Sequence, residues 1–406
     1  MLSPELRLLI ESCKAFISGR EFRQIKDSMD IESIDWIKLQ KMAGYHSIRP
    51  TVYHVLKGQT IQYTAGAPDA FVKELHRIAV SKTLLQQQMA LETERLLILL
   101  EQQSIAVFPY KGAILSKILY ASSNLREWSD LDLFVPRKFA KAALKTLLDD
   151  GYQFAQEETN HAYNSDTNFL DKLLFENGWH EIGLSKSQEN SLPFQLDFHW
   201  QLCEDFYPYT INENDIITGA QKFKLVDSEV IVPSIEHIFL MTLLHHGGRE
   251  SWMRLKYICD LSLFIKLFPD NLFWERILSL CDTAKLKRSL LLGCFCVQKY
   301  LNVALPAILE SKVKSYGERN TRNILKSWEN SVSFWESMSA QLIHKRILLS
   351  HQDEKFSPFN YWIKYMEFYS TPNPMEQPRL RTFNKKYKIA NFFSKVVTYV
   401  WLKGFR

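Results

Sequence analysis

The sequence predicts an α+β fold that is predominantly helical, with a small mixed sheet flanked by N-terminal and C-terminal helical regions. Three observations support this prediction. Apolar residues recur at helical spacing before residue 105 and again after residue 233. Between these limits, short apolar runs and alternating aromatic runs are typical of strands. The 406-residue chain holds only 14 glycines and 14 prolines, which argues against an all-β or low-complexity protein.

The chain divides into four expected regions. They are an N-terminal helical region (1–104), an α/β core (105–233), a C-terminal helical domain (234–356) and a basic, aromatic tail (357–406). The first region opens on Ser3-Pro4-Glu5, which is typical of an N-cap, a first-turn proline and an acid that complements the helix dipole. A chain of this length can bury a sizeable core.

Helices and strands alternate in the expected core. Apolar runs at 105–109 and 131–135 predict buried strands, with a helix over 113–121 between them. A further helix over 137–150 follows Pro136 and ends at Gly151. The remaining strand candidates are 152–154, the stretch around His161–Tyr163, 180–184 and 194–200.

Charge is distributed unevenly along the chain. Residues 377–406 hold eight Lys or Arg residues and no acid, so the rest of the chain is net acidic although the total is +5. The six cysteines show no metal-ligand spacing, which favours a reduced, cytoplasmic setting. No apolar run approaches the roughly 20 residues that span a bilayer.

The aromatic and basic tail has three interpretations. A terminal helix could pack its aromatic face on the body of the protein. Residues 377–406 could instead make a peripheral contact with a membrane surface. The same mixture of lysines and aromatic rings also suits single-stranded nucleic acid.

Two aspartates open the second predicted strand. Asp130 and Asp132 are two positions apart, so on a strand both carboxylates project from the same face. Adjacent acids repel each other unless a cation lies between them, and carboxylate oxygens are preferred ligands of Mg²⁺. The pair therefore indicates a site for Mg²⁺, with Mn²⁺ as the alternative ion. A solvated strand end is the other interpretation of an isolated D-x-D.

A turn and a third acid complete the candidate site. Lys111 and Gly112 form a turn that can approach a phosphate, because glycine permits close backbone approach and the following helix offers free N–H groups. Asp197 lies within the strand candidate QLDFHW, where an ionised carboxylate is costly unless it is paired or bound to metal. Asp197 is thus a candidate metal ligand or general base.

The chain resembles the uncharacterised nucleotidyltransferase family of the polymerase-beta-like superfamily. The resemblance is carried by KGAILSKILYASSNLREWSDLDLFVP at 111–136, by Leu148–Tyr152, by the strand at 196–200, and by the segments 243–265 and 34–56. It covers roughly residues 30 to 300. It implies a metal role for Asp130, Asp132 and Asp197, and a phosphate-turn role for Lys111 and Gly112.

The chain departs from the broader superfamily in two respects. The turn is Lys-Gly-Ala, where that superfamily usually has Gly-Ser or Gly-Gly, so no hydroxyl follows the glycine. The interval from the glycine to the first aspartate is also longer than usual. Both departures bear on how a triphosphate would be held.

Several nearby side chains are further candidates. Arg126 precedes the acids and is a candidate phosphate contact, or else a surface arginine or a partner of Glu127. Arg254 and Lys256 are candidate contacts to phosphate or base, or members of a solvated face. His199 shares the face of Asp197, either beside the metal ligands or as a packed strand residue.

The expected function is Mg²⁺-dependent transfer of NMP from an NTP, ATP included, to an acceptor hydroxyl with release of pyrophosphate. One alternative is a catalytically silent nucleotide-binding or assembly protein of a biosynthetic operon. Another is an RNA 3′-end nucleotidyltransferase of toxin type, although the net acidic body argues against an RNA groove. The sequence leaves open the acceptor (sugar, peptide, protein or RNA), the base and the oligomeric state.

Overall fold

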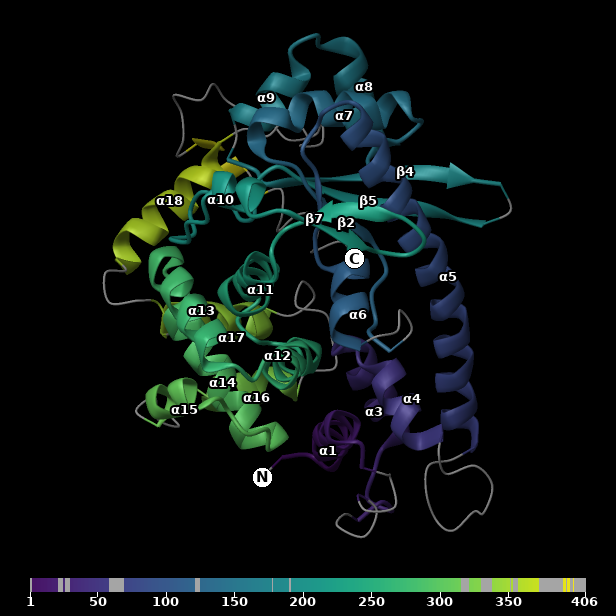
Figure 1. The fold of residues 1–406 in the computed structure, drawn as a ribbon, viewed down its shortest axis with the longest axis vertical. Helices are drawn as coiled ribbons and strands as arrows, with labels where there is room; N and C mark the ends of the chain where they lie inside the picture. Colours follow the sequence, from purple (N-terminus) through teal and green to yellow (C-terminus); the bar gives the residue numbers. More distant parts are fainter. Residues whose placement is uncertain are drawn as a thin grey trace.

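The computed structural model has the α+β, predominantly helical fold that the sequence predicts (Figure 1). It describes residues 2–20, 25, 30–57, 69–120, 125–176, 178–189, 191–314, 321–329, 338–350, 352, 357–371, 390–391, 393–394 and 397. Most of the basic tail after residue 371 therefore lies outside the described residues, and so do the three interpretations of it.

A mixed sheet occupies the centre of the α/β core. In the described part of the chain its strands are β1 (Phe108–Pro109), β2 (Leu131–Phe134), β3 (Gln153–Phe154), β4 (Glu181–Gln188) and β5 (Ser191–His199). Their order across the sheet is β1-β2-β5-β4-β3, in which β2 and β5 are parallel and the other pairs antiparallel. A separate hairpin follows, made of β6 (Gln221–Lys224) and β7 (Glu229–Val232).

Helices cover both sides of this sheet (Figure 1). On one side lie α7 (Ala140–Asp149), α8 (Glu157–Ser165) and α9 (Phe169–Phe175), and α7 is preceded by the 3₁₀ turn η1 (Arg137–Phe139). On the other side, α6 (Gly112–Tyr120) packs against β1 and β2. The order of elements around the two aspartates is the one that the sequence predicts.

The structure corrects one strand prediction. The stretch around His161–Tyr163 belongs to the helix α8. Thr159, Ala162 and Tyr163 recur at the three- and four-residue spacing of a helix face and are turned toward the core. The side-chain amide of Asn160 also exchanges hydrogen bonds with the backbone of Phe154, which fixes the start of this helix beside β3.

The N-terminal region is helical, as predicted. Its described residues include α1 (Pro4–Ser18), α3 (Trp36–Tyr45), α4 (Arg49–Lys57) and the long α5 (Asp69–Gln102). The hydroxyl of Ser3 caps α1 by accepting a hydrogen bond from the Leu6 N–H, in the role that the sequence predicts. Helix α5 runs past the sheet and packs against β1 and β2 (Figure 1).

The C-terminal region is a bundle of helices that packs against α1 and α6. It contains α11 (Ile235–Leu243), the π-helix η2 (Leu244–Arg249), α12 (Leu255–Leu267), α13 (Asn271–Ala284), α14 (Lys287–Leu301), α15 (Ala307–Val313), α16 (Thr321–Trp328), α17 (Met338–Ser350) and α18 (Pro358–Ser370). The short helix α10 (Glu213–Thr218) comes earlier in the chain, before the hairpin of β6 and β7. Helix α12 contacts both α1 and α6, so it links the bundle to the N-terminal helices and to the core.

The apolar core runs through all of these layers. A large cluster of buried apolar residues extends from Leu6 to Ile347, and a smaller one joins Phe206, Leu348 and Tyr361. The division into regions at 104, 233 and 356 stays a prediction. None of the six cysteines, all of which the structure describes, forms a disulfide. Among the residues that the structure describes, no helix combines the length and the apolar character needed to span a bilayer.

Candidate active site

Two of the predicted acids are neighbours in the sheet. Strands β2 and β5 run parallel in a register that pairs Asp132 with Asp197. Paired residues project from the same face, because side chains alternate along each strand in step. Leu131 and Leu133 point the opposite way and are fully buried, so their burial fixes the orientation of Asp132. Asp130 comes directly before β2, two positions from Asp132.

The acids form a cluster with a histidine. One ligand atom from each of Asp132, Asp197 and His199 lies within 4.8 Å of the others. This set combines two carboxylates and one imidazole, and such groups bind divalent cations. A role for Asp130 as a further metal ligand stays a prediction. Its position directly before β2 supports that prediction.

The predicted phosphate turn leads directly into this cluster. Lys111 and Gly112 have positive φ angles of 58° and 26°. A Cβ atom on Gly112 would lie 3.3 Å from the Trp128 ring and 3.5 Å from the Asp130 carbonyl oxygen, so glycine lets the turn approach the loop before β2. The Lys111 Nζ atom lies 2.9 Å from Asp132 Oδ1. The lysine thus brings a positive charge to the face that carries the acids.

The three carboxylates differ in how readily they ionise. Burial opposes ionisation of Asp132, but Lys111 and His199 together hold its pKa below the ordinary value. Burial, and then the charge of Asp132, raises the pKa of Asp197 to about 7. Burial and Asp132 likewise raise the pKa of Asp130. A divalent cation at this oxygen-rich set would relieve the repulsion, so the residues fit the metal that the sequence predicts.

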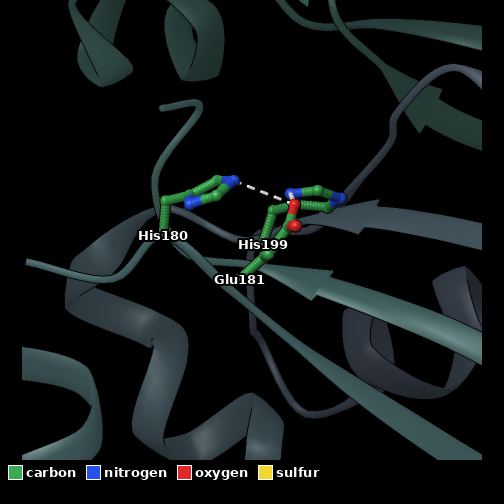
Figure 2. Close-up of side chains that lie close together, drawn as sticks. All are labelled: His180, Glu181 and His199. Carbon is green, nitrogen blue, oxygen red and sulfur yellow. Dashed lines mark ion pairs between the residues drawn. The ribbon is translucent and has the colours of Figure 1, made fainter. Parts of the chain in front are cut away.

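His199 connects Asp132 to an acid that the sequence analysis missed. Its Nε2 atom lies 3.2 Å from Asp132 Oδ1, and its Nδ1 atom lies 3.0 Å from Glu181 Oε2. Glu181 and His199 are paired across β4 and β5 (Figure 2). His180 and Glu181 both lie in the strand candidate 180–184. An antiparallel pairing of this candidate with the one at 194–200 would have placed both residues at this edge of the sheet.

Arg126 lies in a buried ion pair. Its guanidinium group donates to both carboxylate oxygens of Asp260 at 3.0–3.1 Å, and its side chain is only 2% exposed. The Tyr120 hydroxyl and the His246 ring also contact Asp260. Burial opposes the charge on Asp260, yet Arg126 and His246 hold its pKa well below the ordinary value. A direct contact from Arg126 to phosphate stays a prediction.

The loop that carries Arg126 is fixed by its neighbours. The Gln86 side-chain amide donates to the carbonyl oxygens of Arg126 and Trp128. Glu127 pairs with Arg49, so it is not the partner of Arg126. Arg49 belongs to α4 and Gln86 to α5, so these two helices fix the loop that leads into β2.

Arg254 and Lys256 lie at the start of α12, close enough to Asp130 for their charges to interact with its carboxylate. The Lys256 ammonium donates to the Glu127 carbonyl oxygen at 3.0 Å. Burial, followed by the nearby Arg126 charge, lowers the pKa of Lys256 to about 7. Lys256 in turn acts against the rise in the Asp130 pKa that burial causes. Tyr257 and, to a smaller extent, Asp130 raise the pKa of Arg254. The two basic residues therefore belong to the same electrostatic neighbourhood as the acids.

The comparisons with known proteins agree with this geometry. A family model described as an uncharacterised nucleotidyltransferase matches residues 32–302. This range contains the Lys-Gly turn, the three aspartates, His199 and the start of α12. No curated protein matches the chain.

Proposed function

The chain belongs to the uncharacterised nucleotidyltransferase family, and we propose that it is a Mg²⁺-dependent enzyme that transfers NMP from an NTP to an acceptor hydroxyl. The observation that carries the proposal is the parallel register that pairs Asp132 with Asp197. This register gathers acids from two separate segments on one face of the sheet, beside the Lys111 ammonium. Such a face is suited to a cation and a triphosphate together.

Each predicted residue has a proposed role. Asp130 and Asp132 hold the metal, and Asp197 is the third carboxylate, as a ligand or as the base for the acceptor hydroxyl. Lys111 and Gly112 contact phosphate oxygens, with Lys111 exchanging part of its contact with Asp132 for a phosphate. Arg254 and Lys256 are proposed to bind phosphate or base from the start of α12. Arg126 holds α12 in place through Asp260 and so positions these two residues.

The proposed chemistry needs little from the protein beyond positioning and charge. The acceptor oxygen attacks the α-phosphorus, a new P–O bond forms, and the bond to the β-phosphate oxygen breaks to release pyrophosphate. The hydroxyl proton passes to Asp197 when this residue acts as the base, and the raised pKa of Asp197 suits it to that task near neutral pH. Mg²⁺, when bound, would neutralise phosphate charge and polarise the reacting phosphorus.

The activity can be tested without knowing the acceptor. The full-length protein is incubated with each NTP, Mg²⁺ and one acceptor class at a time (a sugar, a peptide, a protein or an RNA), and pyrophosphate release is measured. Mass spectrometry of the acceptor should show addition of one NMP. We expect release with the wild type and none above background with Asp132→Asn. Equal release by both proteins would contradict the proposal.

The geometry gives less support to the alternative of a catalytically silent nucleotide-binding or assembly protein. It would be favoured if Asp197 pointed away from the other acids, because a third carboxylate would then be lacking. Instead, Asp197 is in register with Asp132 and lies within the same 4.8 Å cluster. The proposal of catalysis is supported by this placement.

A further inference from the structure

A second cluster of ligand-type side chains lies at the edge of the sheet next to the acids. His180 comes directly before β4, Glu181 begins that strand, and His199 ends β5 (Figure 2). The Glu181 Oε2 atom lies 2.9 Å from His180 Nε2 and 3.0 Å from His199 Nδ1. One ligand atom from each of the three residues lies within 4.8 Å of the others.

The contacts of Glu181 with the two imidazoles are close ion pairs. Both ring nitrogens of His180 and the Nδ1 atom of His199 are buried and have no well-aligned hydrogen-bond partner among the described residues. A buried polar atom without a partner costs free energy, so native proteins usually satisfy such atoms. Here His180 Nε2 and His199 Nδ1 approach the same carboxylate oxygen, Glu181 Oε2. This arrangement suits three ligands that converge on a shared ion.

A carboxylate also lies near the far nitrogen of each imidazole. Asp132 Oδ1 is 3.2 Å from His199 Nε2, and Glu204 Oε2 is 3.7 Å from His180 Nδ1. Metal-binding histidines commonly donate their second ring N–H to a carboxylate, which fixes the ring and its tautomer. Both histidines therefore have a group that can orient them around an ion near Glu181.

We propose that His180 Nε2, Glu181 Oε2 and His199 Nδ1 bind a transition-metal ion of the zinc class. Ligands about 2.1 Å from one ion lie roughly 3.0–3.4 Å apart, which is close to the distances of 2.9 and 3.0 Å from Glu181 Oε2 to the two ring nitrogens. Two imidazoles and one carboxylate favour Zn²⁺ over Mg²⁺, which prefers oxygen ligands. Glu181 is 33% exposed, so an ion can reach the site from solvent.

The proposed ion would also position Asp132. When His199 Nδ1 binds the ion, its Nε2 N–H donates to Asp132, on the face where the three aspartates lie. The two sites thus have different ligand chemistry, and the His199 imidazole links them through its contact with Asp132. The positioning effect requires the proposed nucleotidyltransferase site, whereas binding of the ion itself does not.

Cobalt supplies a direct spectroscopic test. The full-length apo-protein is titrated with CoCl₂ in excess Mg²⁺, and visible absorption bands of protein-bound Co²⁺ are recorded before displacement with ZnCl₂. We expect one equivalent of Co²⁺ in the wild type and bands that ZnCl₂ abolishes. His180→Ala and Glu181→Gln should weaken Co²⁺ binding by more than about tenfold. Circular dichroism verifies that each variant is folded.

The matched control is an exposed His–Glu pair on α8. His161 and Glu157 lie 3.8 Å apart, are mostly exposed and belong to no three-ligand group in the described part of the chain, so His161→Ala should keep the full cobalt spectrum. Asp130→Asn should also keep the spectrum while it weakens Mg²⁺-dependent nucleotide binding, which separates the two sites. A folded wild type without cobalt bands, or bands unchanged in both His180→Ala and Glu181→Gln, would overturn the proposal. In that case shared protons, and not a metal ion, link the histidines and carboxylates of the cluster.

Discussion

Asp132 and Asp197 are direct partners in the parallel register of β2 and β5, although their segments lie far apart in the sequence. The helices α7, α8 and α9 and the strand β4 lie between them along the chain and bring β5 back beside β2. Since a slip by one residue would turn either carboxylate to the other face, the candidate site depends on this register. The apolar residues Leu131, Leu133, Leu196 and Phe198, all fully buried, hold it in place.

The raised pKa of Asp197 predicts a pH-dependent cost to stability. The folded protein holds a proton on Asp197 up to about pH 7, whereas the unfolded chain loses it near the ordinary value of 3.8. The folded state therefore binds more protons between these values, and this residue's contribution to stability falls as pH rises through that window. We expect the Tm of the wild type to fall relative to that of Asp197→Asn from pH 4 to 7.

Two controls accompany this comparison. Asp149→Asn, at an exposed position of α7, should follow the wild-type pH profile. Adding Mg²⁺ at pH 7 should raise the Tm of the wild type more than that of Asp197→Asn, because an ion bound by the carboxylates stabilises the charged form. Parallel pH profiles for the wild type and Asp197→Asn would contradict the assigned environment.

Loss of Arg126 should destabilise the whole protein. Arg126→Ala leaves the Asp260 carboxylate buried without its bidentate partner, and breaking such a pair typically costs about 3–5 kcal/mol. Arg126→Lys should recover only part of the loss, since one ammonium cannot replace the fork of donors. Urea unfolding measures both. Arg77→Ala, which removes an exposed pair with Glu74, should leave the free energy of unfolding nearly unchanged.

Gly293 tests the packing between α12 and α14. An alanine there would improve helix propensity by about 1 kcal/mol. However, its Cβ would lie 2.5 Å from Trp252 Cζ2 and 2.8 Å from Leu261 Cδ2, and Trp252 is fully buried. Overpacking costs about 1–3 kcal/mol, so we expect Gly293→Ala to lower the free energy of unfolding. Gly44→Ala in α3 meets only ordinary contacts with Arg49 and should be neutral or stabilising.

Local sequence patterns were sufficient to predict much of the fold and the strand face from which Asp130 and Asp132 project. Period-two spacing places Asp130 and Asp132 on one face, and the apolar residues between and after them predict the buried strand β2. The start of α6 at the Lys-Gly pair was likewise predictable from the local sequence. The family match over 32–302 agrees with the resemblance that those motifs carry.

Contacts set by distant segments could not be predicted in the same way. The partner of Arg126 is Asp260, which reaches it only because α12 packs against α6. The pairing of Glu181 with His199 depends on the hairpin register, and a bulge between Lys186 and Gln188 shifts that register before it reaches them. The sequence contains these residues, but the packing of whole helices and strands decides which residues they contact.

Binding of NTP in the presence and absence of Mg²⁺ is the most direct test of the proposed site. Isothermal titration of NTP into the wild type should show binding that depends on Mg²⁺. Asp130→Asn and Asp132→Asn should each weaken the Mg²⁺-dependent part by roughly 10²–10³-fold, as expected for the loss of a charged metal ligand. Asp149→Asn should bind as the wild type does. Equal, Mg²⁺-independent binding by the wild type and both aspartate variants of the site would contradict the metal assignment.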